Sequence, residues 1–173
     1  MAGRSLLTDA MRAAVGRDFR WLTSFPIGAN EIRRWEMAVY YPALPPRLFW
    51  DDEYAAATPF GGIVAPEDFN PFAWMTAEPR PDSIVRAGRP WPEPELGLPE
   101  PLTRANILSG LGVAYTGVRM RPGDVIRSTT RLAGYAEREG RLGLLLITTT
   151  EDRWENQDGA LVRTSRLELI RYR

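Results

Sequence analysis

The last third of the sequence alternates apolar and polar side chains in three long segments that are separated by short turns. The two turns read Arg-Glu-Gly-Arg over residues 138–141 and Asn-Gln-Asp-Gly over residues 156–159, and both are typical of tight hairpin connections. Strands joined in this way pair antiparallel, so the pattern predicts a meander. We expect it to run from about residue 105 to 172, to form most of a sheet, and to contain the segments 125–137, 142–154 and 160–173.

The first half of the sequence has a helical pattern instead. In residues 29–41, the side chains of Ile32, Trp35 and Val39 recur at the spacing of one helix face. Asn30 is a candidate N-cap for this helix. Helices followed by a meander predict an α+β fold.

Residues 76–103 contain seven prolines and interrupt this pattern. Proline removes a backbone donor and breaks both helix and sheet ladders, so we expect residues 78–101 to be extended, non-regular and partly mobile. Two interpretations stay open: a loose excursion, or a lid or partner-binding arm that uses Trp91 and Leu96. We expect a single domain over residues 1–173.

The residue types that are missing exclude whole classes of chemistry. The chain has no Cys and no His, and all 22 of its basic residues are Arg. Triads with histidine, thiol nucleophiles, Schiff-base lysines and His or Cys metal sites are therefore excluded for the chain alone. The 22 acidic residues balance the charge, which argues against a nucleic-acid partner. No apolar stretch is long enough for a membrane span, and we expect a cytoplasmic protein.

Four segments resemble one known family. They are residues 52–66 (DEYAAATPFGGIVAP), 121–126 (RPGDVI), 138–143 (REGRLG) and 155–162 (ENQDGALV). Together they resemble the MaoC-like hydratases and dehydratases, and in particular the N-terminal, fatty-acid-synthase-type dehydratase half of that family. The resemblance implies a hot-dog fold, in which an antiparallel sheet wraps around a central helix.

The resemblance also implies a reaction and shows a departure from it. The family adds water reversibly across a 2-enoyl thioester on coenzyme A or acyl carrier protein, without a further cofactor. Its active members use a G-D-x-N-P-x-H motif, whose Asp and His act as acid and base. Aligned through Asp51 and Tyr54, these Asp, Asn and His positions fall on Leu44, Pro46 and Phe49, which cannot transfer a proton.

Residues 68–71 read Asp-Phe-Asn-Pro, which matches part of the same motif without its His. Asp68 and Asn70 are therefore candidate catalytic residues, with Glu67 as a neighbouring acid. The alternative is structural: Asn70 caps a helix that begins at Pro71, or Glu67 and Asp68 lie in a first helical turn opened by Pro66. Tyr41 is a further candidate as a hydrogen-bond donor, or else packs as an amphipathic side chain. Arg47 is a candidate contact for the pyrophosphate of a coenzyme A ligand, or else an exposed or interface arginine.

Three functions remain open. The first is a non-catalytic or half-site subunit of an (R)-type 2-enoyl-CoA hydratase or 3-hydroxyacyl-thioester dehydratase, which pairs with a catalytic MaoC-like chain that supplies the Asp and His. The second is a homodimeric acyl-thioester binding module without chemistry. The third is a self-sufficient dehydratase that uses Asp68.

Overall fold

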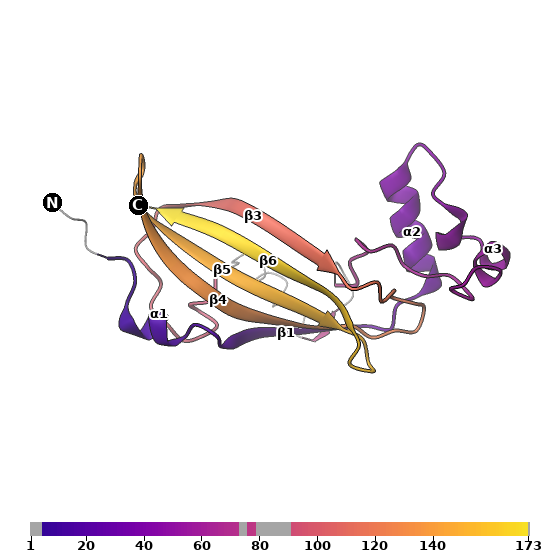
Figure 1. The fold of residues 1–173 in the computed structure, drawn as a ribbon, viewed down its shortest axis with the longest axis horizontal. Coiled ribbons are helices and arrows are strands. Elements are labelled where there is room, and N and C mark those ends of the chain that lie inside the picture. The colour runs from indigo at the N-terminus through magenta and orange to yellow at the C-terminus, as the bar shows by residue number, and fades with distance from the viewer. Residues whose placement is uncertain (1–4, 73–75, 79–90, 173) are drawn as a thin grey trace.

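The computed structural model describes residues 5–72, 76–78 and 91–172, and its centre is one antiparallel sheet (Figure 1). The described part of this sheet has six strands in the order β2-β1-β4-β5-β6-β3. The strands are β1 (Asp18–Ser24), β2 (Thr76–Glu78), β3 (Ala105–Tyr115), β4 (Arg127–Gly140), β5 (Gly143–Glu155) and β6 (Leu161–Tyr172).

The predicted meander is confirmed by β4, β5 and β6, which pair antiparallel in sequence order. The turn between β4 and β5 consists of residues 141–142 instead of the predicted 138–141, of which residues 138–140 belong to β4. Gly143, the first residue of β5, has φ +92°, and Gly159 in the second turn has φ +77°, both in the left-handed region where other residues are strained. In the second turn, the Gly159 amide donates to the Asn156 carbonyl at 3.0 Å. β3 then lies beside β6 and forms one edge of the described sheet.

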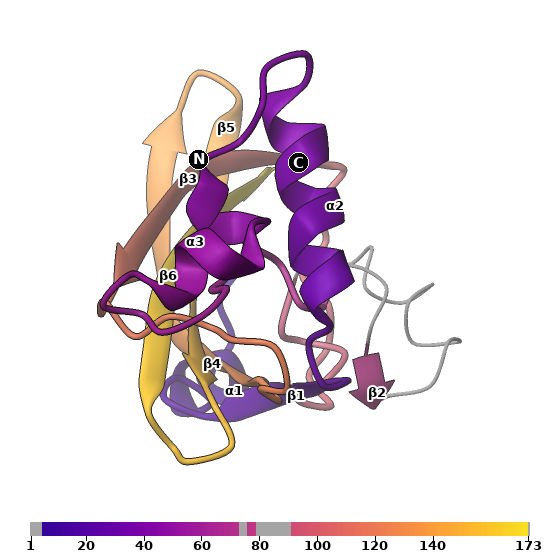
Figure 2. The same ribbon diagram turned by 90° about the vertical axis from the view of Figure 1, so that its right-hand side faces the viewer.

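The helices of the described chain are short, apart from one. They are α1 (Asp9–Ala13), α2 (Ala29–Tyr40), the 3₁₀ turn η1 (Arg47–Phe49) and α3 (Asp52–Ala56). α2 and α3 lie together beyond one end of the sheet, and α1 lies near the other end (Figures 1 and 2). The longest described helix therefore lies beside the end of the sheet instead of within its curve.

The start of α2 differs from the prediction. Its N-cap is Gly28, whose amide donates to the Glu31 carboxylate at 2.9 Å. Asn30 lies inside the first turn, where its side-chain oxygen accepts from Arg33 at 3.0 Å. The predicted apolar face is also shorter than expected, because Ile32 is fully buried whereas Val39 is 53% exposed.

Two groups of core residues lie at opposite ends of the molecule. The larger one joins the α2–α3 region to the ends of β5 and β6 through Ile32, Trp154 and Val162. The other joins α1 to the sheet through Met11, Leu146 and Leu132. We call the sheet face that carries Leu132, Leu146 and Arg171 the inner face.

A register shift in β4 shapes the inner face. Leu132 pairs with Thr150, and Tyr135 pairs with Thr148. Because Thr148 and Thr150 are two residues apart on β5, they share a face, and so do Leu132 and Tyr135. The extra residue of the bulge thus turns Tyr135 inward.

Part of the proline-rich segment packs on the inner face. The first three residues of the proline-rich segment 76–103 form β2, which contains no proline and pairs with β1. Glu78, the first residue of the stretch expected to be non-regular, therefore lies in a strand. Residues 79–90 lie outside the described residues. The described residues 91–104 form turns without a helix or strand, and Leu96 and Leu98 pack against the sheet.

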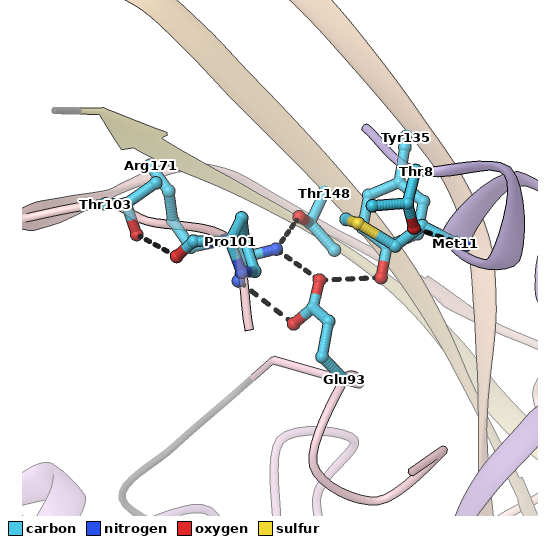
Figure 3. Close-up of polar contacts among 8 residues, drawn as sticks. All are labelled: Thr8, Met11, Glu93, Pro101, Thr103, Tyr135, Thr148 and Arg171. Atoms are coloured by element: carbon cyan, nitrogen blue, oxygen red, sulfur yellow. Dashed lines mark hydrogen bonds and ion pairs between the residues drawn. The ribbon is translucent and has the colours of Figure 1, made fainter. Parts of the chain in front are cut away.

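A buried ion pair holds this segment in place (Figure 3). The Arg171 guanidinium donates to both carboxylate oxygens of Glu93, at 2.6 and 2.9 Å, and the two side chains are only 3% and 0% exposed. The Tyr135 hydroxyl donates to Glu93 at 2.6 Å, and Arg171 also donates to the Thr148 hydroxyl at 2.8 Å. Burial, and then the Glu93 carboxylate, raise the pKa of Tyr135, so its hydroxyl keeps its proton.

Replacing Arg171 with Met should destabilise the chain by about 3–5 kcal/mol, because it leaves the Glu93 carboxylate buried without its partner. Urea unfolding measures this change. The double replacement Glu93→Leu with Arg171→Met should lower the free energy of unfolding by less than Arg171→Met alone, because neither charge remains buried.

Arg166→Met provides the control on the same strand. Arg166 pairs with Glu151 at 3.0 Å, but both side chains are about half exposed. Its loss should cost less than about 1 kcal/mol. A similar cost for the Arg166 and Arg171 variants would contradict the assignment of Glu93–Arg171 as a buried structural pair.

Candidate functional site

The segment between α2 and α3 carries the positions where the family resemblance places the Asp, Asn and His. Leu44 is 76% exposed, and Pro46 is also exposed. Phe49 lies in η1 and packs against the larger core group. The Trp50 indole N–H donates to the Pro45 carbonyl at 3.0 Å and orders the loop. None of the side chains at the three motif positions can act as an acid or a base.

A cavity of about 190 Å³ lies beside this segment, and we call it the helix-side cavity. Its walls come from α2, from η1 and from the chain that follows α3. The lining residues are Glu36, Val39, Tyr40, Phe49, Pro66 and Asp68. The structure therefore brings Phe49, the expected His position, together with the candidate Asp68.

Glu36 is a site residue that the sequence interpretation missed. It is 1% exposed, and its Oε2 has no hydrogen-bond partner among the described residues. Burial, and then the charge of Asp68, raise the pKa of Glu36. The sequence did contain a sign that Glu36 is buried. Glu36 follows Ile32 by four residues, so it lies on the apolar face of α2, where a charged residue is unexpected.

Of the candidates at residues 67–70, only Asp68 is among the residues that line the cavity. Asp68 is exposed, so it lies on the solvent side of Glu36. Glu67 is directed to Arg119, with 3.4 Å between its Oε1 and the guanidinium. The Asn70 side-chain oxygen accepts from the Phe72 amide at 3.0 Å, which closes a local turn.

Two candidates lie apart from the cavity lining. Tyr41 is 83% exposed on the loop after α2. The Arg47 guanidinium donates twice to the Asp51 carboxylate, at 2.7 and 2.9 Å, and lies over the Tyr54 ring at 4.8 Å. The Tyr54 amide, and then Arg47, lower the pKa of Asp51.

A second cavity of about 190 Å³ opens on the inner face of the sheet, and we call it the inner-face cavity. Phe19, Leu111 and Leu167 supply apolar walls. Polar groups supply the rest of the lining: Arg20, Thr130, Thr150, Asp152 and Ser165.

Asp152 is fixed in this cavity by three donors. Its Oδ1 accepts from Ser128 at 2.6 Å and from Thr130 at 3.1 Å, and its Oδ2 accepts from the Trp154 indole at 2.6 Å. An immobile carboxylate among apolar walls suits a mostly apolar ligand that carries a hydrogen-bond donor.

The polar groups that line both cavities are carboxylates and hydroxyls, with the Arg20 guanidinium in the inner-face cavity. Within residues 5–72, 76–78 and 91–172, no group of three or more acidic side chains is placed to hold a metal ion. In the same residues, no helix is long and apolar enough to cross a membrane.

Sequence comparison assigns the family. The pattern of the family described as "FAS1-like, dehydratase domain region" matches residues 13–165. The chain therefore belongs to this dehydratase-domain family, in agreement with the resemblance of its motifs. No curated protein matches the sequence.

Solved structures confirm the hot-dog fold. The ChsH1–ChsH2 complex from Mycobacterium tuberculosis superposes with a TM-score of 0.63 at 17% identity, over 95% of this chain and 92% of that one. The (R)-hydratase PhaJ1 from Pseudomonas aeruginosa superposes with a TM-score of 0.57 at 18% identity, over 91% of this chain and 81% of that one. The dehydratase complex HadBC from Mycobacterium tuberculosis superposes with a TM-score of 0.53 at 17% identity, over 90% of this chain and 99% of that one.

Replacing Glu36 with Gln should change how stability depends on pH. Because the pKa of Glu36 is raised, the folded chain binds this proton more tightly than the unfolded chain does. The resulting stabilisation is complete below the ordinary value of 4.5 and is lost as pH rises through the raised pKa. As pH rises above 4.5, the variant should therefore gain stability relative to the native chain.

Urea unfolding at several pH values measures this gain. Glu53→Gln is the matched control, because Glu53 is exposed on α3 and outside the cavity lining. If the Glu36 and Glu53 variants follow the same pH profile, Glu36 does not titrate as a buried acid.

Proposed function

We propose that this chain is a half-site subunit of a 2-enoyl-thioester hydratase or 3-hydroxyacyl-thioester dehydratase, and that a catalytic MaoC-like chain supplies the Asp and His. The reaction adds the oxygen of water to the β-carbon and a proton to the α-carbon, or runs in reverse. The family assignment supports the reaction class, and the composition of the chain supports the need for a partner.

The requirement for a partner follows from the missing base. Positioned acid–base catalysis accelerates such a reaction by about 10²–10⁴-fold. The chain contains no His, and the residues at the motif positions are Leu44, Pro46 and Phe49.

The observation that carries the proposal is an uncovered apolar row on β3. Leu108 pairs with Leu169, and Leu111 pairs with Leu167, so a bulge between them keeps both on the inner face. With Val113 and Tyr115, they form a row that we call the β3 row, and its members are 38–61% exposed.

This row lies on an edge strand of 11 residues. An exposed edge with apolar side chains is a template for pairing with another chain, and folded proteins normally cover it. A second hot-dog domain beside β3 would continue the sheet and bury the row.

The inner-face cavity is the proposed place for part of the acyl group. Leu111 belongs both to its lining and to the β3 row, so the cavity opens toward the surface that the partner would cover. Apolar walls suit the acyl chain, and Asp152 suits a hydroxyl on it.

Two-chain assemblies occur among the similar folds: ChsH1–ChsH2 and HadBC are both described as complexes of two proteins. The β3 row would equally fit a second copy of this chain, which is the arrangement of the homodimeric binding module. The self-sufficient dehydratase has its own support, because Asp68 shares a cavity with Glu36.

The purified chain alone should show negligible hydration of a 2-enoyl-CoA, measured by loss of the enoyl absorbance. Adding a MaoC-like chain with an intact Asp–His motif should restore turnover. Mass spectrometry verifies that the isolated chain carries no partner. Robust turnover by the chain alone, abolished by Asp68→Asn, would instead establish the self-sufficient dehydratase.

Leu108→Arg should weaken association with the partner by at least about tenfold, because it places a charge in the apolar interface. Leu142→Arg is the matched control: Leu142 is 56% exposed, against 58% for Leu108, but lies in the β4–β5 turn. Light scattering and titration calorimetry measure both variants. If the two variants weaken association equally, β3 is not part of the interface. If the native chain self-associates and the Leu108 variant does not, the homodimer is favoured.

A further inference from the structure

The helix-side cavity has a charge imbalance that the half-site function does not explain. Glu36 lies in its wall with an unpartnered Oε2, and Asp68 adds a second carboxylate on the solvent side. Of the other charged groups nearby, Glu67 is directed to Arg119, and Arg47 is paired with Asp51.

Arg163 is the charged group of β6 that acts on Asp68. It is stacked on the Trp154 ring, with 3.4 Å between the guanidinium carbon and the ring centroid, and it does not line the cavity. Among the described residues that line the cavity, two are carboxylates and none is a cation, so the lining has an acidic excess.

The rim of the cavity is apolar and exposed. Val39 and Tyr40 belong to its lining and are 53% and 40% exposed. The adjoining loop adds Tyr41 and Leu44, which are 83% and 76% exposed. Apolar and aromatic side chains around a pocket can exclude water from a charged pair inside it, as the contacts around a binding hot spot do.

We propose that the helix-side cavity is the receptor for an arginine side chain of the partner subunit, whose guanidinium pairs with Glu36 and Asp68. This inference rests on the proposed function for the source of the arginine. The carboxylate pair and the size of the cavity are properties of the chain itself.

The lining favours arginine over other cations. A guanidinium donates in a planar fork to carboxylate oxygens and stacks on aromatic rings, whereas an ammonium is a more strongly hydrated point charge. Tyr40 and Phe49 supply the rings, and Glu36 and Asp68 supply the acceptors. The cavity, at about 190 Å³, has room for a guanidinium and the end of its stem.

The cavity is also linked to the proposed interface. Arg163 on β6 interacts with Tyr115, the last member of the β3 row, and with Asp68. In Figure 1, β3 runs toward the end of the sheet where α2 and α3 lie. A partner that covers the β3 row therefore has a short route to the cavity.

The pocket is tested first without the partner. N-acetyl-arginine methylamide serves as the probe, and the uncharged N-acetyl-citrulline methylamide has nearly the same shape. Titration at low salt, followed by NMR, should show the arginine probe binding about tenfold more tightly than the citrulline probe, as expected for a charge-assisted hydrogen bond. Binding should strengthen as pH rises through the raised pKa of Glu36, because the charged carboxylate attracts the guanidinium more strongly than the neutral carboxyl does.

Glu36→Gln should abolish this preference for arginine, and Glu53→Gln, with the same change of charge on an exposed residue, should preserve it. Asp68→Asn provides a second variant on the solvent side of the cavity, should Glu36→Gln fail to fold. Equal affinity for the two probes, or an arginine preference that survives both cavity variants, would overturn the inference.

The second test uses the complex with the catalytic chain. Glu36→Gln should raise its dissociation constant about tenfold, whereas Glu53→Gln should leave it unchanged. A complex that forms equally well with the Glu36 variant overturns this inference and leaves the half-site function intact. Failure of the native chain to form any complex overturns the half-site function, while the probe experiment still reports on the pocket.

Discussion

The buried pair between Glu93 and Arg171 determines how the inner face of the sheet is covered. Residues 91–98 contain Pro92 and Pro94 and form no sheet ladder, so backbone hydrogen bonding cannot hold them there. Two charge-assisted hydrogen bonds and the packing of nearby leucines replace that ladder. Because an isolated buried charge is very unfavourable, the segment and β6 are held to one arrangement.

This anchoring covers one part of the inner face and leaves another part open. α1 and residues 91–98 cover the end near Leu146, and the α2–α3 region packs at the end near Trp154. Between them lie the inner-face cavity and the β3 row, which no described segment buries. The fold thus presents an apolar surface next to a polar cavity, which is a favourable position for a ligand that a second subunit encloses.

The sequence predicted local features well and distant ones poorly. The strands of the meander were placed to within a few residues, because the glycine-containing turns and the period of two are local signals. Asn30 was wrongly taken as the N-cap. The helix begins two residues earlier, where the Glu31 carboxylate accepts from the free backbone amide of Gly28. Glu93 and Arg171 are 78 residues apart, so no local pattern links them. Glu36 was missed because only the apolar residues of α2 were used to define its face.

The position of Glu36 has a physical consequence for the choice of partner. In the isolated chain, burial and the charge of Asp68 raise the pKa of Glu36, because the cavity holds the neutral carboxyl at lower cost than the charged one. A guanidinium that enters the cavity reverses this preference, because the charged carboxylate then gains a partner. A subunit without a cation at this place would gain no such pairing and would bury the exposed Asp68 carboxylate without a partner, which is the kind of penalty that separates correct from incorrect association. In the proposed complex, the exposed apolar side chains around the cavity would supply contact area for any partner, and Glu36 with Asp68 would discriminate among partners.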